Sequence, residues 1–353
     1  MAPTFANGYA LLIGVTENQV AGWALPDVAK DITALAEVLQ HPQRCAYPAS
    51  QVRVITGPAA TRAGITDGLD WLAERLAADG SGNATAVIYY SGHGWRDDEA
   101  TPPAYYLIPY DVREATLRAR ALRAADFAAG IAALHPRRLL VLLDCCHAAG
   151  MGVKGAAPAT GFLSAAIPAQ LMLAGEKGLV AAGSKGLERL AQGTGRAALS
   201  SSQGSQPSYI RRDRRMSIFT YHLIEALTGH AQPAAGATEV LVSDVMGHVW
   251  RRVPQSARAE YDADQQPDSQ VSGDFPVALL LGGQGVGKGL AAPDPLAPPA
   301  AAAPGGDQIR ATGPVATHGS AVNTGRGVAF VGNGNTVITG QVGGDVRVEA
   351  KTQ

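Results

Sequence analysis

The sequence predicts an α/β protein with a mostly parallel central sheet of about six strands and helices on both faces. Short apolar runs alternate with amphipathic stretches through most of the 353 residues, which is the pattern of strands joined by helical crossovers. The run Leu139–Leu143 (LLVLL) is apolar at every position, as expected for a strand that is buried on both faces. Together these observations indicate an α/β/α sandwich.

The first apolar run, Tyr9–Val15, is predicted to be a buried strand. Pro26–Gln40 follows as an amphipathic helix, because Ile32, Leu35 and Leu39 recur at the spacing of one helical face. The same patterns give further strands at Gln51–Thr56, Ala84–Tyr90, Leu139–Leu143, Leu179–Ala182 and Phe275–Leu281, and further helices at Thr66–Ala78, Ala124–Leu134, Ile218–Thr228 and Val242–Val253.

The composition changes after Leu281. We expect a large domain over residues 1–283, a Gly/Ala/Pro-rich linker over 284–311 and a small β-rich or partly disordered module over 312–353. The module contains the β-like pieces GVAFVG, TVITG and DVRVE, and Asn333-Gly334-Asn335 is a suitable turn between the first two. About 40 residues with so few large side chains can hardly build a stable core alone. The module is therefore expected to bind a partner, to self-associate or to stay largely disordered.

Charge and cysteine content exclude several classes of function. A net charge of −1 offers no positive field to nucleic acid or to an anionic membrane. No apolar run reaches the roughly 18 residues of a membrane span, and the N-terminal sequence lacks the basic region and cleavage site of a signal peptide. Three cysteines cannot form a disulfide framework. We therefore expect a cytoplasmic protein with no nucleic-acid or membrane partner.

Two strand ends carry reactive side chains. The third strand runs into Ser91-Gly92-His93-Gly94, and the fourth runs into Asp144-Cys145-Cys146-His147. In open α/β sheets, sites lie beyond the carboxyl ends of the strands, so neighbouring strands would bring His93 and a cysteine together. A nearby imidazole promotes deprotonation of a thiol, and backbone N–H groups beside glycines can bind an oxyanion. The pattern points to nucleophilic catalysis, whereas Cys45 is expected to be an inert buried thiol.

Two other functions, a zinc site and a nucleotide-binding loop, are disfavoured. Cys145 and Cys146 point to opposite faces of a strand, so they and His147 fit poorly around one tetrahedral zinc ion. The run Gly282–Lys288 (GGQGVGK) has the spacing of a phosphate-binding loop. However, Gly289 replaces the Ser or Thr that would bind magnesium, and an Ala/Pro linker follows where a helix is needed. No metal or nucleotide is expected.

The motif YYSGHG, followed about fifty residues later by LLVLLDCCHAAG, resembles the caspase-like cysteine peptidases of clan CD (peptidase C14), especially the prokaryotic metacaspase-like or orthocaspase type. LLIGV, YYLIPYD and FTYHLIEALTG extend the resemblance over about residues 8–282. It implies a caspase-like α/β/α sandwich with a large segment (about 1–150) and a small segment (about 178–283). It also implies that Cys146 is the nucleophile and His93 the general base, with the backbone N–H groups of Gly94 and Cys146 as the oxyanion hole.

Two carboxylates are expected to determine which substrate residue precedes the cleaved bond. Asp144 and Cys146 point to the same face of their strand, so Asp144 should lie beside the nucleophile. Asp31 matches the position whose carboxylate, in the family that the chain resembles, joins it in the S1 pocket. Two carboxylates in a partly closed slot demand a cation, and the guanidinium of arginine satisfies them best. We expect cleavage of protein or peptide substrates after Arg, then Lys.

The resemblance also implies self-processing, with candidate cleavage sites at Lys154, Lys177, Arg212 and Arg215. The Arg211–Arg215 cluster could instead dock substrates, and a simply solvated cluster is the favoured alternative. Calcium is not favoured, because residues 147–160 contain no Asp or Glu, although Asp97, Asp98, Glu99 and Asp111 could supply oxygen ligands.

The leading hypothesis is a cysteine endopeptidase of the metacaspase type in a regulated bacterial defence or cell-death-like response. The alternative is a catalytically silent caspase-like scaffold that acts through its C-terminal module, which could bind a regulatory partner or self-associate.

Overall fold

The computed structural model describes residues 3–145, 163–164, 167, 169–173, 195–203, 206–231, 233–234 and 236–281, and near the C-terminus residues 321–322, 328–331, 336–339 and 347–350. Its contacts divide the chain into two units, residues 1–296 and 297–353. The first unit holds the central sheet and the candidate site, and the second holds a small sheet.

Six strands form the central sheet in the order β11-β9-β7-β3-β1-β2. They are β1 (Gly8–Gly14), β2 (Val52–Thr56), β3 (Thr85–Gly92), β7 (Arg138–Cys145), β9 (Gly195–Ser200) and β11 (Asp268–Ser272). The first five run parallel, and β11 pairs antiparallel with β9 at the edge. The predicted α/β fold with a mostly parallel six-stranded sheet is therefore confirmed.

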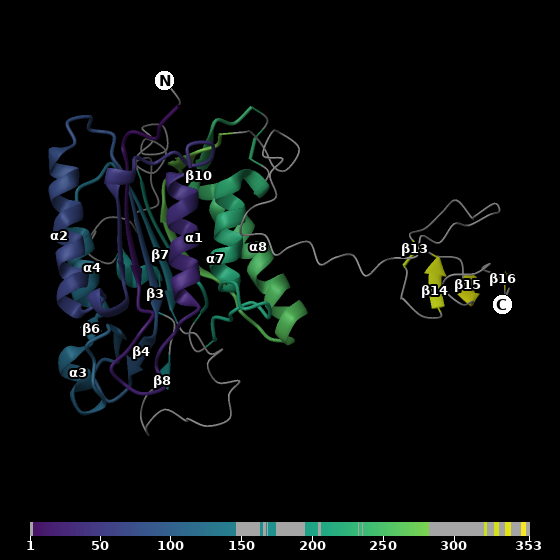
Figure 1. Ribbon diagram of the computed structural model, residues 1–353, viewed down its shortest axis with the longest axis horizontal. Helices are drawn as coiled ribbons and strands as arrows, with labels where there is room; N and C mark the ends of the chain where they lie inside the picture. The colour runs from purple at the N-terminus through teal and green to yellow at the C-terminus, as the bar shows by residue number, and fades with distance from the viewer. Residues whose placement is uncertain are drawn as a thin grey trace. The chain divides into compact units, whose positions relative to one another are not determined.

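Helices cover both faces of this sheet (Figure 1). One face carries α1 (Val28–Gln40), α7 (Ile218–Glu225) and α8 (Val242–Tyr261), and the other carries α2 (Arg62–Ala78) and α4 (Ala124–Ala132). Alternate residues of β7 enter the two cores: Leu140 and Leu142 pack on the α1/α7 face, whereas Val141 and Leu143 pack on the α2/α4 face. Two further short helices are α3 (Leu117–Arg120) and α5 (Ala169–Met172).

Two smaller sheets flank the central one. One has the order β6-β5-β4-β8 and comprises β4 (Gly94–Asp97), β5 (Ala104–Leu107), β6 (Leu122–Arg123) and β8 (Leu163–Ser164). The other pairs β10 (Glu239–Leu241) with β12 (Pro276–Leu279). The strand expected at Phe275–Leu281 therefore forms as β12, but it pairs outside the central sheet. The strand expected at Leu179–Ala182 lies outside the described residues.

The predicted helices form with shifted ends. α2 starts at Arg62 because the Thr61 hydroxyl caps it, accepting a hydrogen bond from the Gly64 N–H at 2.9 Å. α8 continues through Pro254 to Tyr261 and ends at Asp262, which adopts a left-handed conformation (φ +50°). α7 is followed by a π turn, Ala226–His230, in which Gly229 has φ +90°.

In the second unit, four strands pair antiparallel in chain order: β13 (Ala321–Val322), β14 (Val328–Val331), β15 (Thr336–Thr339) and β16 (Arg347–Ala350). The expected turn Asn333-Gly334-Asn335 lies outside the described residues, and the strands on either side of it pair with each other. Across the described parts of the chain, no helix combines the length and apolar character that a membrane span requires.

Candidate active site

His93 lies between the end of β3 and the start of β4, at the carboxyl edge of the parallel strands. Its backbone carbonyl accepts hydrogen bonds from the Ile108 N–H (3.1 Å) and from the Tyr90 hydroxyl (3.2 Å). The same hydroxyl lies 3.2 Å from the Ile108 carbonyl. Gly92 makes this close approach possible, because a Cβ atom there would lie 2.7 Å from the Tyr90 hydroxyl oxygen. Two hydrogen bonds to the His93 carbonyl, from Ile108 and from Tyr90, thus hold the Gly-His turn in place.

The His93 ring is held at its Nε2 atom. Nε2 lies 3.0 Å from the Trp23 carbonyl oxygen, and the two rings meet edge to face with centroids 6.1 Å apart. A carbonyl oxygen can only accept a hydrogen bond, so Nε2 is the donor, and a neutral ring in this orientation holds its lone pair on Nδ1.

The predicted adjacency of the two reactive strand ends is confirmed. β3 pairs in parallel with β7, with Ser91 opposite Asp144 and Gly92 opposite Cys145. Cys145 is fully buried on the α2/α4 face of the sheet. Gly94, expected to contribute an oxyanion donor, is the first residue of β4. Cys146, the expected nucleophile, lies outside the described residues.

The two carboxylates expected in the S1 pocket come together on the other face. Asp144 is the penultimate residue of β7 and has the same orientation as Leu142, and Asp31 lies in the first turn of α1; neither is exposed to solvent. Ser217 bonds both: its N–H donates to Asp31 Oδ1 at 2.8 Å, and its hydroxyl donates to Asp144 Oδ2. Residues far apart in the sequence therefore form one compact acidic cluster.

Hydroxyl groups surround Asp144. Ser208 Oγ donates to Oδ1 at 2.8 Å, and Thr220 Oγ1 lies 3.1 Å from Oδ2. Gln265 supports this arrangement, with its side-chain N–H donating to the Ser201 carbonyl (3.0 Å) and to Ser208 Oγ (3.2 Å). Asp144 is thus held in place by neutral donors, which leave its charge uncompensated.

Only one of the two carboxylate oxygens of Asp31 has a hydrogen-bond partner. Its second oxygen, Oδ2, is buried without a hydrogen-bond partner. Burial, together with the negative charge of Asp144, raises the pKa of Asp31 well above its usual range. Within the described residues, no Lys, Arg or His forms an ion pair with Asp31 or Asp144. The cluster lacks a cation.

Asp27, one helical turn before Asp31, differs in this respect. Arg214 Nη2 lies 2.5 Å from its Oδ2, and Lys30 Nζ lies 2.8 Å from its Oδ1. Lys30 also donates to the Arg214 carbonyl. These contacts fasten the basic loop to α1 and pair Asp27 with two cationic groups, unlike Asp31 and Asp144.

The basic loop that carries Arg212 and Arg215 is an ordered turn. Its ends pair through an Ile210–Ser217 bridge, and the Arg214 N–H donates to the Arg211 carbonyl at 2.8 Å. The Arg212 N–H donates to Glu260 Oε2 at 2.7 Å. Self-cleavage at Arg212 or Arg215 stays a prediction, and it requires this turn to open. Lys154 and Lys177 lie outside the described residues.

The carboxylates considered for calcium are paired with arginines. Arg118 contacts Asp97 (2.7 Å) and Glu99 (2.5 Å), Arg96 contacts Asp98 (2.8 Å), and Arg120 lies 3.6 Å from Asp111. Calcium independence stays a prediction.

Several residues of the site were not anticipated from the sequence, namely Ser208, Ser217, Thr220 and Gln265. One signal was available. Ser217 directly precedes an apolar helical run, and its hydroxyl caps α7 by accepting a hydrogen bond from the Thr220 N–H at 2.9 Å. The same hydroxyl therefore caps a helix and holds Asp144.

Replacing Ser217 by alanine is expected to lower the free energy of unfolding by about 1–3 kcal/mol, because a helix cap and a hydrogen bond to a buried carboxylate are lost together. Urea unfolding followed by circular dichroism measures the change. Ser50, exposed beside β2, gives the matched control Ser50→Ala, which should have no effect. Equal midpoints for the two variants would contradict the assigned role of Ser217.

Residues 7–273 match the family model described as the caspase domain, peptidase C14. The chain therefore belongs to the caspase-domain family of peptidases.

Among solved structures, caspase-1 from Spodoptera frugiperda is similar, with 14% sequence identity and a TM-score of 0.42 over 80% of this chain and 92% of that chain. A structure described as pro-sf-caspase-1 matches at the same identity and TM-score, over 77% of this chain and 94% of that one. Comparison with curated proteins gave no match.

Proposed function

We propose that the chain is a cysteine endopeptidase of the metacaspase type that cleaves proteins or peptides after arginine, and less efficiently after lysine. Membership of the caspase-domain family supports the peptidase chemistry. The observation that carries the specificity is the acidic cluster of Asp31 and Asp144, fully buried and without a cationic partner among the described residues.

A substrate arginine supplies what this cluster lacks. Its guanidinium offers a planar set of N–H donors that can bond both carboxylates, including the unpartnered Asp31 Oδ2. Lysine brings the same charge but no planar fork, so it should bind less tightly. A substrate aspartate would place a third negative charge in the cluster and should be rejected.

In the proposed reaction, His93 Nδ1 accepts the proton of the Cys146 thiol, and the thiolate attacks the peptide carbonyl after the basic residue. The backbone N–H groups of Gly94 and Cys146 bind the oxyanion. The imidazolium then protonates the leaving amine, and water hydrolyses the thioester to release the acid and the free thiol. The Nε2 bond to the Trp23 carbonyl keeps the ring in the required tautomer.

Fluorogenic peptides that differ only in an Arg, Lys or Asp before the scissile bond test this proposal. We expect kcat/KM to fall in the order Arg, Lys, Asp, with Asp at least about 10³-fold below Arg, because a buried charge facing like charges costs several kcal/mol. Preference for Asp would overturn the specificity.

The same preparation distinguishes the peptidase from a catalytically silent scaffold that acts through its C-terminal module. An intact His93 turn favours the peptidase, and the absence of hydrolysis of every peptide would favour the scaffold. N-terminal sequencing of the incubated protein shows whether Lys154, Lys177, Arg212 or Arg215 is cut. A cytoplasmic location, a role in bacterial defence and recruitment through the C-terminal module remain part of the proposal.

A further inference from the structure

Two histidines and a glutamate meet between α7 and α8, outside the acidic cluster and the His93 turn. His222 Nδ1 lies 2.6 Å from Glu225 Oε2, and His248 Nε2 lies 2.9 Å from the same oxygen. One ligand atom from each residue lies within 4.8 Å of the other two. The two histidine side chains are nearly fully buried, and the Glu225 side chain keeps 15% of its surface exposed. The cluster is therefore compact, and Glu225 is its most exposed member.

The side-chain types suit a metal ion. Two imidazoles and one carboxylate form a ligand set of tetrahedral zinc sites that keep a fourth position for water.

Two of the three separations between ligand atoms need little adjustment. Ligand atoms about 2.0–2.1 Å from a tetrahedral ion lie about 3.3 Å from one another. The two N···O separations of 2.6 and 2.9 Å would have to widen by less than about 1 Å, which small rotations of the side chains allow.

A hydrogen-bond partner for the second ring nitrogen of His222 is also present. His222 Nε2 lies 2.7 Å from Ser256 Oγ on α8. A metal-bound histidine usually donates its other N–H to such a group, which fixes the orientation of the ring. In the metal-free chain, Glu225 accepts from both histidines instead, so the cluster is satisfied with or without an ion.

We propose that His222, Glu225 and His248 form a binding site for a divalent transition metal of the zinc type, which fastens α7 to α8. Imidazole ligands favour Zn²⁺, Co²⁺ or Ni²⁺ over the oxygen-preferring Ca²⁺ and Mg²⁺. Ser217, the N-cap of α7, and Thr220 in its first turn hold Asp144, and His222 and Glu225 lie in its last turn. A metal at this end therefore rigidifies the helix that supports the acidic cluster.

Titration of tag-free, full-length Cys146→Ala protein with Co²⁺, followed by its visible absorption, tests the site. The background removes the thiol expected to react, so the result does not depend on the proposed peptidase function. We expect one Co²⁺ per chain, displaced by Zn²⁺, and a higher melting temperature with Zn²⁺ than with chelator.

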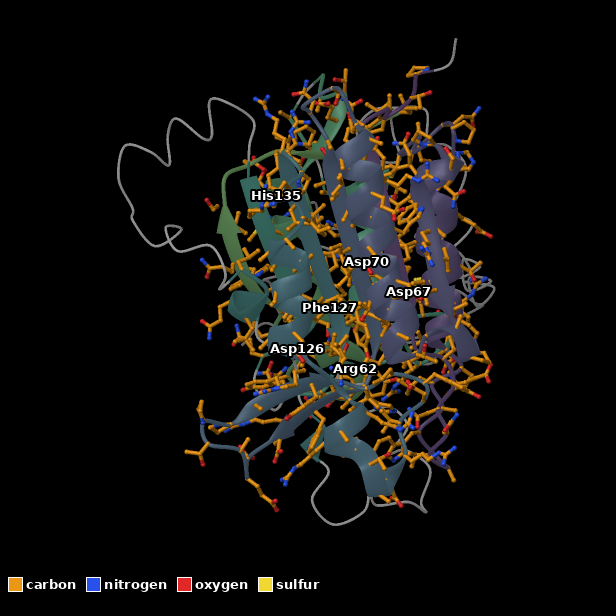
Figure 2. The ribbon with its side chains drawn as sticks, turned by 90° about the vertical axis from the view of Figure 1, so that its left-hand side faces the viewer. Arg62, Asp67, Asp70, Asp126, Phe127 and His135 are labelled. Atoms are coloured by element: carbon orange, nitrogen blue, oxygen red, sulfur yellow. The ribbon has the colours of Figure 1, made fainter. Side chains whose placement is uncertain are left out.

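In the same background, Glu225→Gln and His248→Gln should weaken Co²⁺ binding at least about 10-fold, and Ser256→Ala, which leaves all three ligands in place, about 10-fold. The matched control is His135→Gln, an exposed histidine beyond α4 that Figure 2 places on the α2/α4 face. It should bind Co²⁺ like the parent.

Melting temperatures in chelator separate loss of the metal from loss of the fold. The proposal is overturned if the parent gives no Co²⁺ absorption, or if folded Glu225→Gln and Ser256→Ala proteins bind Co²⁺ within about twofold of the parent, since outer partners normally change affinity by 10- to 100-fold.

Discussion

Replacing His93 by alanine is expected to lower kcat for arginine peptides by about 10³-fold, because general base catalysis contributes about 10²–10⁴-fold. KM should change little, since the ring contacts the Trp23 carbonyl rather than the acidic cluster. Steady-state kinetics on the Arg peptide measure both constants, and the exposed His135 supplies the control His135→Ala. A loss of less than about tenfold would remove His93 from the proton transfer.

Substituting each of the two adjacent cysteines in turn tests which of them is the nucleophile. Cys145 is fully buried in the core on the α2/α4 face, so Cys145→Ala should retain activity and lose only stability, by about 1 kcal/mol. Cys146→Ala should be inactive even at high enzyme concentration. Inactivity of Cys145→Ala together with activity of Cys146→Ala would move the nucleophile by one residue and overturn the assignment.

The parts of the fold that could be predicted from the sequence are those in which burial is visible locally. β3 and β7 are apolar on both faces, and α1 has a clear apolar stripe. β9 and β11 gave no such signal, because β9 (GRAALS) consists largely of small residues and β11 (DSQVS) is a half-exposed polar strand at the sheet edge. Their place in the sheet depends on pairing with distant strands, which no local pattern encodes.

The acidic cluster, too, could be predicted from the sequence only in part. Strand alternation places Asp144 on the face of Leu142, and the family resemblance singles out Asp31. The hydroxyl groups that hold Asp144 come from Ser208, Ser217 and Thr220, which are polar residues of a loop and a helix start more than sixty residues further along the chain. These hydroxyl groups reach Asp144 only through contacts between distant parts of the chain, which no local pattern encodes.

The cluster of His222, Glu225 and His248 was missed for a similar reason. His222 and Glu225 have i, i+3 spacing on one helix, which by itself fits an ordinary surface pair. The third member, His248, lies on α8, and it joins them only because α7 and α8 pack together.

Asp31→Asn is expected to change stability and activity in opposite directions. Burial, reinforced by Asp144, raises the pKa of Asp31, so the folded chain binds its proton more tightly than the unfolded chain does. Below the unfolded pKa of about 3.9, both states are protonated and no penalty arises. As the pH rises above that value, the unfolded carboxyl ionises first, so the stability of the fold decreases until the folded pKa is passed.

Asparagine removes this penalty and keeps an oxygen that can accept the hydrogen bond from the Ser217 N–H. The variant should therefore unfold at higher urea than the parent at pH 7, by about 1 kcal/mol, with the difference shrinking toward pH 4. Its kcat/KM for the Arg peptide should fall about 100-fold or more, because removing one partner of a buried charge pair costs about 3 kcal/mol. Urea unfolding at several pH values and steady-state kinetics measure the two effects.

Asp67→Asn, at an exposed position on α2 shown in Figure 2, is the matched control and should change neither stability nor activity. A variant of Asp31 that gains stability but keeps full activity would show that the buried carboxyl serves no substrate cation. One that loses both would show that Asp31 supports the fold rather than the specificity.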